Sequence, residues 1–231
     1  MIEITQTGVV AQPGAVERLR EQFSATGCAA LPGLLARPVL AHLMKLVETS
    51  DFELKEEVGV FPRVTSEARV FGRTLFAPHY DPARFSLLFL INKTPLFRLV
   101  ESITGCPPLG NFLGRLHQTR AVPDQHIDWH NDLSDNRVVG LNINLSAHDY
   151  SGGLFQLRGP GFPVPAEVGR IPAGDAFLFR IEEGWNHRLT PVESGVRTVC
   201  VGWFRTDPDR ETFFRRWLFS DAAQYRPLEV Q

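Results

Sequence analysis

The sequence predicts one mainly β domain with flanking helices, in which short strands form a jelly roll or a closed barrel. Between about residues 109 and 204, short apolar runs follow one another at regular spacing, separated by Gly, Pro, Asn and Asp. Many short strands without helical segments between them are typical of these two architectures. Before that stretch, apolar residues recur at helical spacing. Because 231 residues suit one large domain, we expect a single domain over 1–231, with a helical part over about 1–108 and the barrel over about 109–204.

Three N-terminal helices are predicted from apolar spacing and from end signals. The first covers 15–26 and stops at a glycine, and Pro38 opens the second. The third begins with Thr94 as N-cap before a first-turn proline, and it ends before Gly105. Helical spacing of aromatic residues returns near the C-terminus, which predicts a short helix over about 209–220. We expect the helices to pack against the β structure by their apolar faces.

Eight strands are predicted in the second half of the chain. They cover 112–120, 125–131, 136–145, 153–158, 164–170, 176–181, 186–190 and 196–204. Turn-forming glycine, proline, asparagine or aspartate separates most of them. The set is compatible with a double-stranded β-helix, that is, a jelly-roll or cupin-like barrel buttressed by the N-terminal helices.

Composition excludes several classes of partner. The 24 basic and 26 acidic residues give a formal net charge of −2, which argues against a nucleic-acid footprint and a polybasic membrane surface. The three cysteines are widely spaced and odd in number, which favours a reducing compartment over a disulfide scaffold. The first residues lack the pattern of a signal peptide, and no apolar run could span a bilayer. We expect a cytoplasmic protein without a membrane or nucleic-acid partner; its oligomeric state is left open.

A run of alternating polar residues at the second predicted strand indicates a metal site. Successive side chains of a strand point to opposite faces, so four ionisable residues share one face. These are His126, Asp128, His130 and Asp132. Such a face needs either solvent or a metal ion. One His-x-Asp pair with a histidine from a distant strand would complete the two-histidine, one-carboxylate set of non-haem Fe(II) oxygenases.

An arginine on the last predicted strand indicates an anion site. Arg197 shares its strand face with Val199, Val201 and Trp203. An unpaired buried charge is costly, so this arginine needs an anionic partner. No carboxylate lies on that strand, and a bound dicarboxylate, held bidentately, would supply one. A structural ion pair with a distant Asp or Glu is the alternative.

These features occur in an order that resembles the Fe(II)/2-oxoglutarate-dependent dioxygenases, most closely their prolyl-4-hydroxylase-like branch. The order is His-x-Asp, Gly152-Gly153, Gly174-Asp175, His187, and Arg197 ten residues further on. The resemblance covers roughly 109–204, and the stretch FSATGCAALPGLL at 23–35 is also similar to relatives. It implies the double-stranded β-helix that the strand pattern predicts.

The resemblance also implies roles for individual residues. His130 and Asp132 would be the proximal metal ligands and His187 the distal one. Arg197 would bind the C5 carboxylate of 2-oxoglutarate, with Asn144 and Arg120 as further cosubstrate contacts. The chain departs from the family's R-x-S pattern, because Val199 stands where the serine would be. The second donor to the C5 carboxylate must then come from elsewhere, and Asn144 and Thr190 are the candidates.

Two His-x-Asp pairs compete for the metal. His126 and Asp128 lie in the middle of the predicted strand, whereas His130 and Asp132 meet the loop that follows it. Metal ligands of these barrels lie at a strand's end near the open mouth, which favours the second pair. The first pair would then lie beside the site, on its substrate side or in solvent.

The function implied is a hydroxylase that uses Fe(II), 2-oxoglutarate and O2 and has no catalytic residue beyond the metal centre. It would hydroxylate an unactivated C–H bond of a small molecule, an amino acid or a natural-product intermediate, with release of succinate and CO2. Desaturation or cyclisation at the same centre, and a peptidyl substrate, stay open. Two rivals are a cupin-like metal-dependent isomerase or dioxygenase that does not use 2-oxoglutarate, and a barrel that binds a ligand without turnover.

Overall fold

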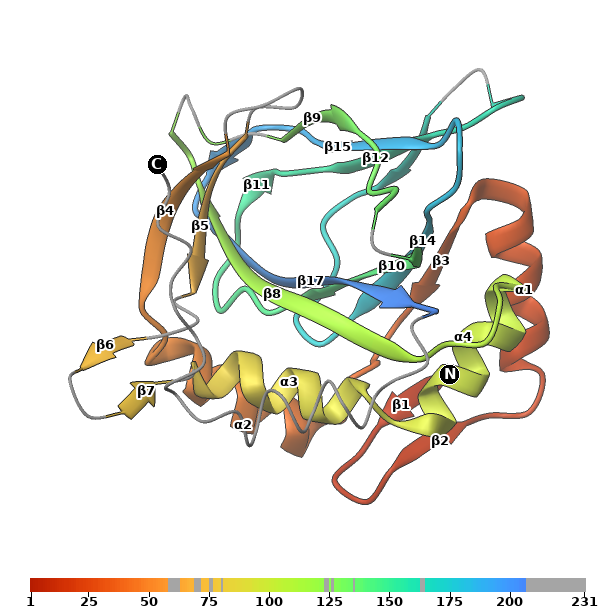
Figure 1. The fold of residues 1–231 in the computed structure, drawn as a ribbon, viewed down its shortest axis with the longest axis horizontal. Coiled ribbons are helices and arrows are strands. Elements are labelled where there is room, and N and C mark those ends of the chain that lie inside the picture. Colours follow the sequence, from red (N-terminus) through yellow and green to blue (C-terminus); the bar gives the residue numbers. More distant parts are fainter. Residues whose placement is uncertain are drawn as a thin grey trace.

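The computed structural model describes a curled antiparallel sheet with helices packed along one side and one end (Figure 1). The described residues are 1–57, 63–68, 72–74, 77–79, 81–122, 125, 127–134, 136–162 and 165–206. The predicted C-terminal helix over about 209–220 lies outside them. Among the described residues, no helix is both long enough and apolar enough to cross a membrane.

All three predicted N-terminal helices are present. They are α1 (Ala15–Thr26), α2 (Arg37–Glu48) and α4 (Thr94–Thr104). Lys93 rather than Thr94 is the N-cap of α4, and Thr94 is its first helical residue. A further helix, α3 (Pro82–Ile91), was not predicted, because its nearly continuous apolar run has no helical period. Asp81 caps it by accepting a hydrogen bond from the backbone N–H of Arg84.

The eight predicted strands are all present. They are β8 (Asn111–Arg120), β9 (Ile127–His130), β10 (Arg137–Asn144), β12 (Phe155–Arg158), β13 (Ala166–Val168), β14 (Ala176–Arg180), β15 (Asn186–Leu189) and β17 (Val196–Arg205). The long strand β17 pairs antiparallel with β8 on one side and β10 on the other. On the opposite wall, β15 pairs with β9 and β12.

Other strands were not predicted. They are β1 (Ile2–Ile4), β2 (Val9–Ala11), β3 (Cys28–Leu31), β4 (Phe52–Glu57), β5 (Arg63–Ala68), β6 (Gly72–Thr74), β7 (Ala77–His79), β11 (Ser151–Gly152) and β16 (Val192–Ser194). Three of them join the eight in one 11-stranded sheet with the order β13-β12-β15-β9-β5-β8-β17-β10-β14-β3, where β4 pairs with β5. Within the described residues this sheet is a jelly roll and not a closed barrel, because β3 occupies the edge of β14.

The Gly174-Asp175 turn fastens the N-terminal segment to the sheet. The Asp175 carboxylate accepts a hydrogen bond from the backbone N–H of Gly33 at 2.8 Å. The carbonyl of Gly174 accepts one from the N–H of Leu35 at 3.0 Å. These two hydrogen bonds therefore connect the Gly174-Asp175 turn to the N-terminal segment that contains Gly33 and Leu35. The sequence analysis quoted the two motifs separately.

The core has two parts. The larger part lies between the helices and the sheet, where Phe97 and Phe204 meet edge to face at a centroid distance of 5.7 Å. The smaller part lies inside the curl of the sheet and contains Phe155, Phe179 and Trp203. Because these aromatic side chains line the interior, they form the walls of the site described next.

Candidate metal centre

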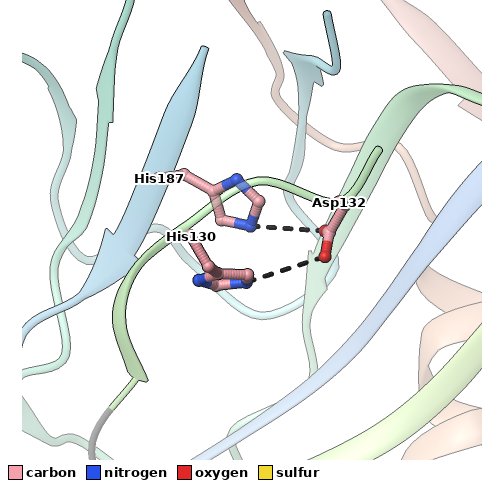
Figure 2. A group of neighbouring side chains, drawn as sticks. All are labelled: His130, Asp132 and His187. Carbon is pink, nitrogen blue, oxygen red and sulfur yellow. Dashed lines mark ion pairs between the residues drawn. The ribbon is translucent and has the colours of Figure 1, made fainter. Parts of the chain in front are cut away.

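Three side chains converge inside the curled sheet: His130, Asp132 and His187 (Figure 2). His130 ends β9 and lies directly across from His187 of β15 in the strand register. Asp132 follows two residues later in the chain. Its Oδ2 lies 3.3 Å from Nε2 of His187, and its Oδ1 lies 3.6 Å from Nε2 of His130. All three side chains are buried, and their ligand atoms lie within 4.8 Å of one another.

Aromatic packing fixes the ring of His187. The ring stacks on Phe155 at a centroid distance of 5.4 Å and contacts Phe179 at 4.8 Å and His130 at 4.2 Å. The Phe179 ring needs the space above Gly140, because a β-carbon there would come within 1.9 Å of the Phe179 Cζ. A glycine on the neighbouring strand is therefore part of what holds this ligand in place.

The backbone orients His130. Its Nδ1 lies 2.8 Å from the carbonyl oxygen of Asp128. When Nδ1 carries the proton it donates to this carbonyl, and the lone pair of Nε2 is left for a metal ion. Asp128 itself is exposed, and its carboxylate accepts a hydrogen bond from the N–H of Trp129. The carboxylate of Asp128 is thus not part of the cluster, and His126 lies outside the described residues.

Asp132 is an ionised carboxylate with several donors around it. Burial alone would raise its pKa, but the hydrogen bond and charge of His187, the charge of His130 and the Trp203 N–H hold the pKa well below its usual range. The Trp203 indole donates to Oδ2 at 2.6 Å. Asp132 is therefore charged at neutral pH, as a metal ligand must be.

The donor set suits a divalent transition metal. Two imidazole nitrogens and one carboxylate oxygen are the protein ligands of non-haem Fe(II) sites, which leave other coordination positions open. The two imidazoles and the carboxylate are buried beside the aromatic side chains of the inner cluster. The three residues could therefore bind iron.

Arg197 lines the same cavity as the three ligands. It is 5% exposed, its Nε has no hydrogen-bond partner, and no carboxylate of the described residues pairs with it. Burial lowers its pKa, and the charge and hydrogen bond of Tyr150 oppose that shift. The structural ion pair considered in the sequence analysis is therefore absent from the described part of the chain, and the guanidinium is left for an anion.

The other two residues expected to contact the cosubstrate lie elsewhere. The Asn144 amide donates to the carbonyl of Ile171 and accepts from the N–H and hydroxyl of Ser146. Arg120 is exposed and donates to the Gln118 side chain. Neither of the two lines the cavity. Their cosubstrate roles stay predictions.

Thr190, the other candidate second donor, is also engaged outside the cavity. Its hydroxyl accepts a hydrogen bond from the N–H of Leu154 at 2.8 Å. Tyr150 acts on Arg197 itself, because its hydrogen bond and charge raise the pKa of Arg197 against the effect of burial.

Among the polar cavity residues, the sequence analysis did not assign Thr119, Asn142, His117 and Arg188 to the site. Asn142 is 5% exposed, and its Oδ1 has no hydrogen-bond partner among the described residues. Its two-residue offset from Asn144 on one strand was the available signal. His117 is buried and lines the cavity.

Comparisons with known proteins agree with this geometry. Residues 116–205 match the family model described as 2OG-Fe(II) oxygenase superfamily. Over 99 residues the chain is 34% identical to PKHD-type hydroxylases of two Synechococcus strains, in an alignment that covers 38% of this chain and 42% of each relative. The chain therefore matches less than half the length of these curated relatives.

Solved structures share the fold. An oxidoreductase of the 2OG-Fe(II) oxygenase family from Burkholderia pseudomallei superposes with a TM-score of 0.64 at 16% identity, over 86% of this chain and 94% of that one. A prolyl hydroxylase from Trichoplax adhaerens, solved with a peptide fragment, gives 0.62 at 16% identity, over 84% and 90%. The resemblance to the superfamily stated in the sequence analysis is confirmed over residues 116–205, and the solved prolyl hydroxylase shares the fold. The matched family implies Fe(II), 2-oxoglutarate and O2.

Proposed function

We propose that this protein is a non-haem Fe(II)- and 2-oxoglutarate-dependent oxygenase that hydroxylates an unactivated C–H bond of a small molecule. One observation carries the proposal: a buried arginine, which no carboxylate of the described residues pairs with, lines the cavity that also contains two histidines and an ionised carboxylate. A dicarboxylate with one end on a metal ion and the other on a cation fits this pairing of charges.

The metal ligands and the arginine have separate roles. His130, Asp132 and His187 would hold Fe(II), and Arg197 would bind the C5 carboxylate of 2-oxoglutarate. Fe(II), when bound with 2-oxoglutarate and O2, supplies the oxidation, with succinate and CO2 as products of the cosubstrate. Phe155 and Phe179 make the wall beside His187 apolar, so that bulk water is kept from the ligands on that side.

The rival functions account for less of the cavity. A cupin-like enzyme without 2-oxoglutarate would use the three metal ligands but would leave Arg197 buried without an anionic partner among the described residues, at a cost in stability. A barrel that only binds a ligand has no use for three converging metal ligands. Each of these two alternative functions therefore leaves either the buried Arg197 or the three metal ligands without a role.

The proposal also includes a substrate class and a cellular location. We take an amino acid or a natural-product intermediate as the substrate class, with a peptidyl side chain as the next class, since one structural neighbour was solved in complex with a peptide fragment. A net charge of −2 supports a substrate other than nucleic acid. The three cysteines are all free, which supports a reducing, cytoplasmic location.

The test is the conversion of 2-oxoglutarate to succinate by the iron-loaded protein in air. The protein need not convert many molecules of 2-oxoglutarate when no primary substrate is present. The assay therefore includes a panel of free amino acids and short peptides as candidate primary substrates. We expect succinate above background from the wild type and none from His187→Ala, with the exposed His148→Ala as matched control. Equal succinate from wild type and His187→Ala would overturn the proposal.

A further inference from the structure

We propose that Trp203 is a positioning residue for the metal centre: its indole N–H holds the Asp132 carboxylate in the orientation that the metal ion needs. The inference rests on the proposed function only in requiring that the three ligands bind a metal ion. It concerns a residue that the sequence analysis placed on the strand face of Arg197 and gave no role.

The contact is short and has a fixed direction. The Trp203 Nε1 donates to the Asp132 Oδ2 at 2.6 Å, and both side chains are buried, at 4% and 8% exposure. An indole N–H only donates, so the bond requires an acceptor oxygen and favours the ionised carboxylate. A donor of this kind beside a ligand acts on the ligand's orientation rather than on the metal directly.

Asp132 needs such a partner because its own backbone does little to fix it. It lies beyond the end of β9, between Asn131 and Leu133, which are both exposed. His130 and His187, by contrast, lie on strands that pair with each other. Trp203 belongs to β17, which is paired along its length with β8 and β10, so it brings a rigid donor to a residue on a loop.

The indole itself is held in place from several sides. Trp203 lies across from Gly140 in the strand register, where a side chain is missing. The Arg137 guanidinium stacks over the indole at 4.0 Å from the ring centroid, and that of Arg115 lies at 5.4 Å. The same Arg137 approaches the Asp132 Oδ1 to 3.9 Å. The carboxylate therefore meets the indole at one oxygen and the guanidinium near the other.

A role as core filler is the competing account, since Trp203 also packs in the inner apolar cluster. The two accounts differ in one respect. A filler acts through its ring, whereas a positioning residue acts through its N–H. Replacing the ring by another ring without a donor separates them.

The experiment measures the affinity of the apo-protein for Mn(II) by electron paramagnetic resonance and for Co(II) by absorbance. Trp203→Phe removes the N–H and keeps an aromatic ring. Trp129→Phe is the matched control: it follows Asp128 and precedes the ligand His130, and its ring lies under Arg158 at 4.2 Å, away from Asp132. Removing an outer contact of a metal ligand typically weakens binding by about 10–100-fold.

We expect Kd for both ions to rise about 10-fold in Trp203→Phe and to stay within about 2-fold of wild type in Trp129→Phe. A second variant carries 3-benzothienylalanine at position 203, which keeps the indole shape but replaces N–H by sulfur. It should show the same weakening, even if Trp203→Phe folds poorly.

Unchanged Kd in the benzothienylalanine protein would overturn the inference and leave the proposed function intact, because the wild type would still bind metal. If the wild type binds neither ion, the metal site itself fails, and the inference falls with it.

Discussion

Gly153 lies directly against the side chain of Arg197: a β-carbon on Gly153 would come within 2.9 Å of the Arg197 Cδ. Gly153 also has a φ of 62°, which favours glycine. Its neighbour Gly152 faces backbone instead, since a β-carbon there would lie 2.3 Å from the carbonyl oxygen of Pro191. Gly153 therefore leaves room for the side chain of the buried Arg197, whereas Gly152 leaves room for the neighbouring backbone.

This relationship predicts the effect of Gly153→Ala. The methyl group would displace Arg197, and the affinity of the metal-loaded protein for 2-oxoglutarate should fall at least about 10-fold, the equivalent of about 1.4 kcal/mol. The control is Gly161→Ala, which also has a positive φ (78°) but no atom within 4 Å of the added carbon. Both variants should lose about 1–2 kcal/mol of stability in urea titrations. An equal loss of cosubstrate affinity in the two would refute the role of Gly153.

The sequence was sufficient for the jelly-roll strands, because each of those apolar runs is short and bounded by turn residues. It was not sufficient for β3, whose strand identity depends on pairing with β14, far away in the chain. Among the site residues, the order of motifs singled out His130, Asp132, His187 and Arg197, and the structure brings these together around one cavity.

Side-chain contacts between different elements could not be predicted from the sequence. Trp203 could be assigned to a strand face, but its bond to Asp132 depends on where the loop after β9 lies. Asn142 and Asn144 share a strand face and differ only in the partners that surround them: Ile171 and Ser146 engage the Asn144 amide. Such differences arise from tertiary packing and leave no periodic signal.

Asn142→Leu should raise stability and lower cosubstrate affinity together. A buried carbonyl oxygen without a partner costs about 1–3 kcal/mol, and a leucine of similar shape would remove that cost. Thermal unfolding of the apo-protein should therefore shift upward. Isothermal titration of the metal-loaded variant should show weaker binding of 2-oxoglutarate, since the cavity loses a polar wall. A variant that is more stable and binds the cosubstrate equally well would show that Asn142 has no part in binding.

Asp175→Ala should destabilise the fold without touching the metal centre. It removes the acceptor for the Gly33 N–H and so releases the N-terminal segment, at about 1.5–3 kcal/mol for a bond to a charged group. Asp149→Ala removes an exposed ion pair with Arg170 and should cost less than about 1 kcal/mol. Urea unfolding measures both. Weakened Co(II) binding by Asp175→Ala would mean that this turn supports the site as well.

The cysteines should differ in reactivity in the native state. Burial raises the pKa of Cys28 and of Cys200 to about 12, so both thiols stay protonated at pH 8.5 as well as inaccessible. Cys106 is half-buried and has a raised pKa, so it should react slowly. Mass spectrometry after iodoacetamide treatment should find one modified site in the native protein and three in urea. Rapid native labelling of Cys200 would contradict this packing.

The central claim is that a metal ion and Arg197 hold the two ends of one molecule of 2-oxoglutarate. The most direct test is an anaerobic titration of the apo-protein with Fe(II) and then 2-oxoglutarate, followed in the visible spectrum, for the wild type, Arg197→Met and the exposed-arginine control Arg158→Met. We predict a weak charge-transfer band in the wild type and in Arg158→Met, which appears in Arg197→Met only at 2-oxoglutarate concentrations at least about 10-fold higher. Fe(II) binding without any such band, or an identical titration of all three proteins, would contradict the account.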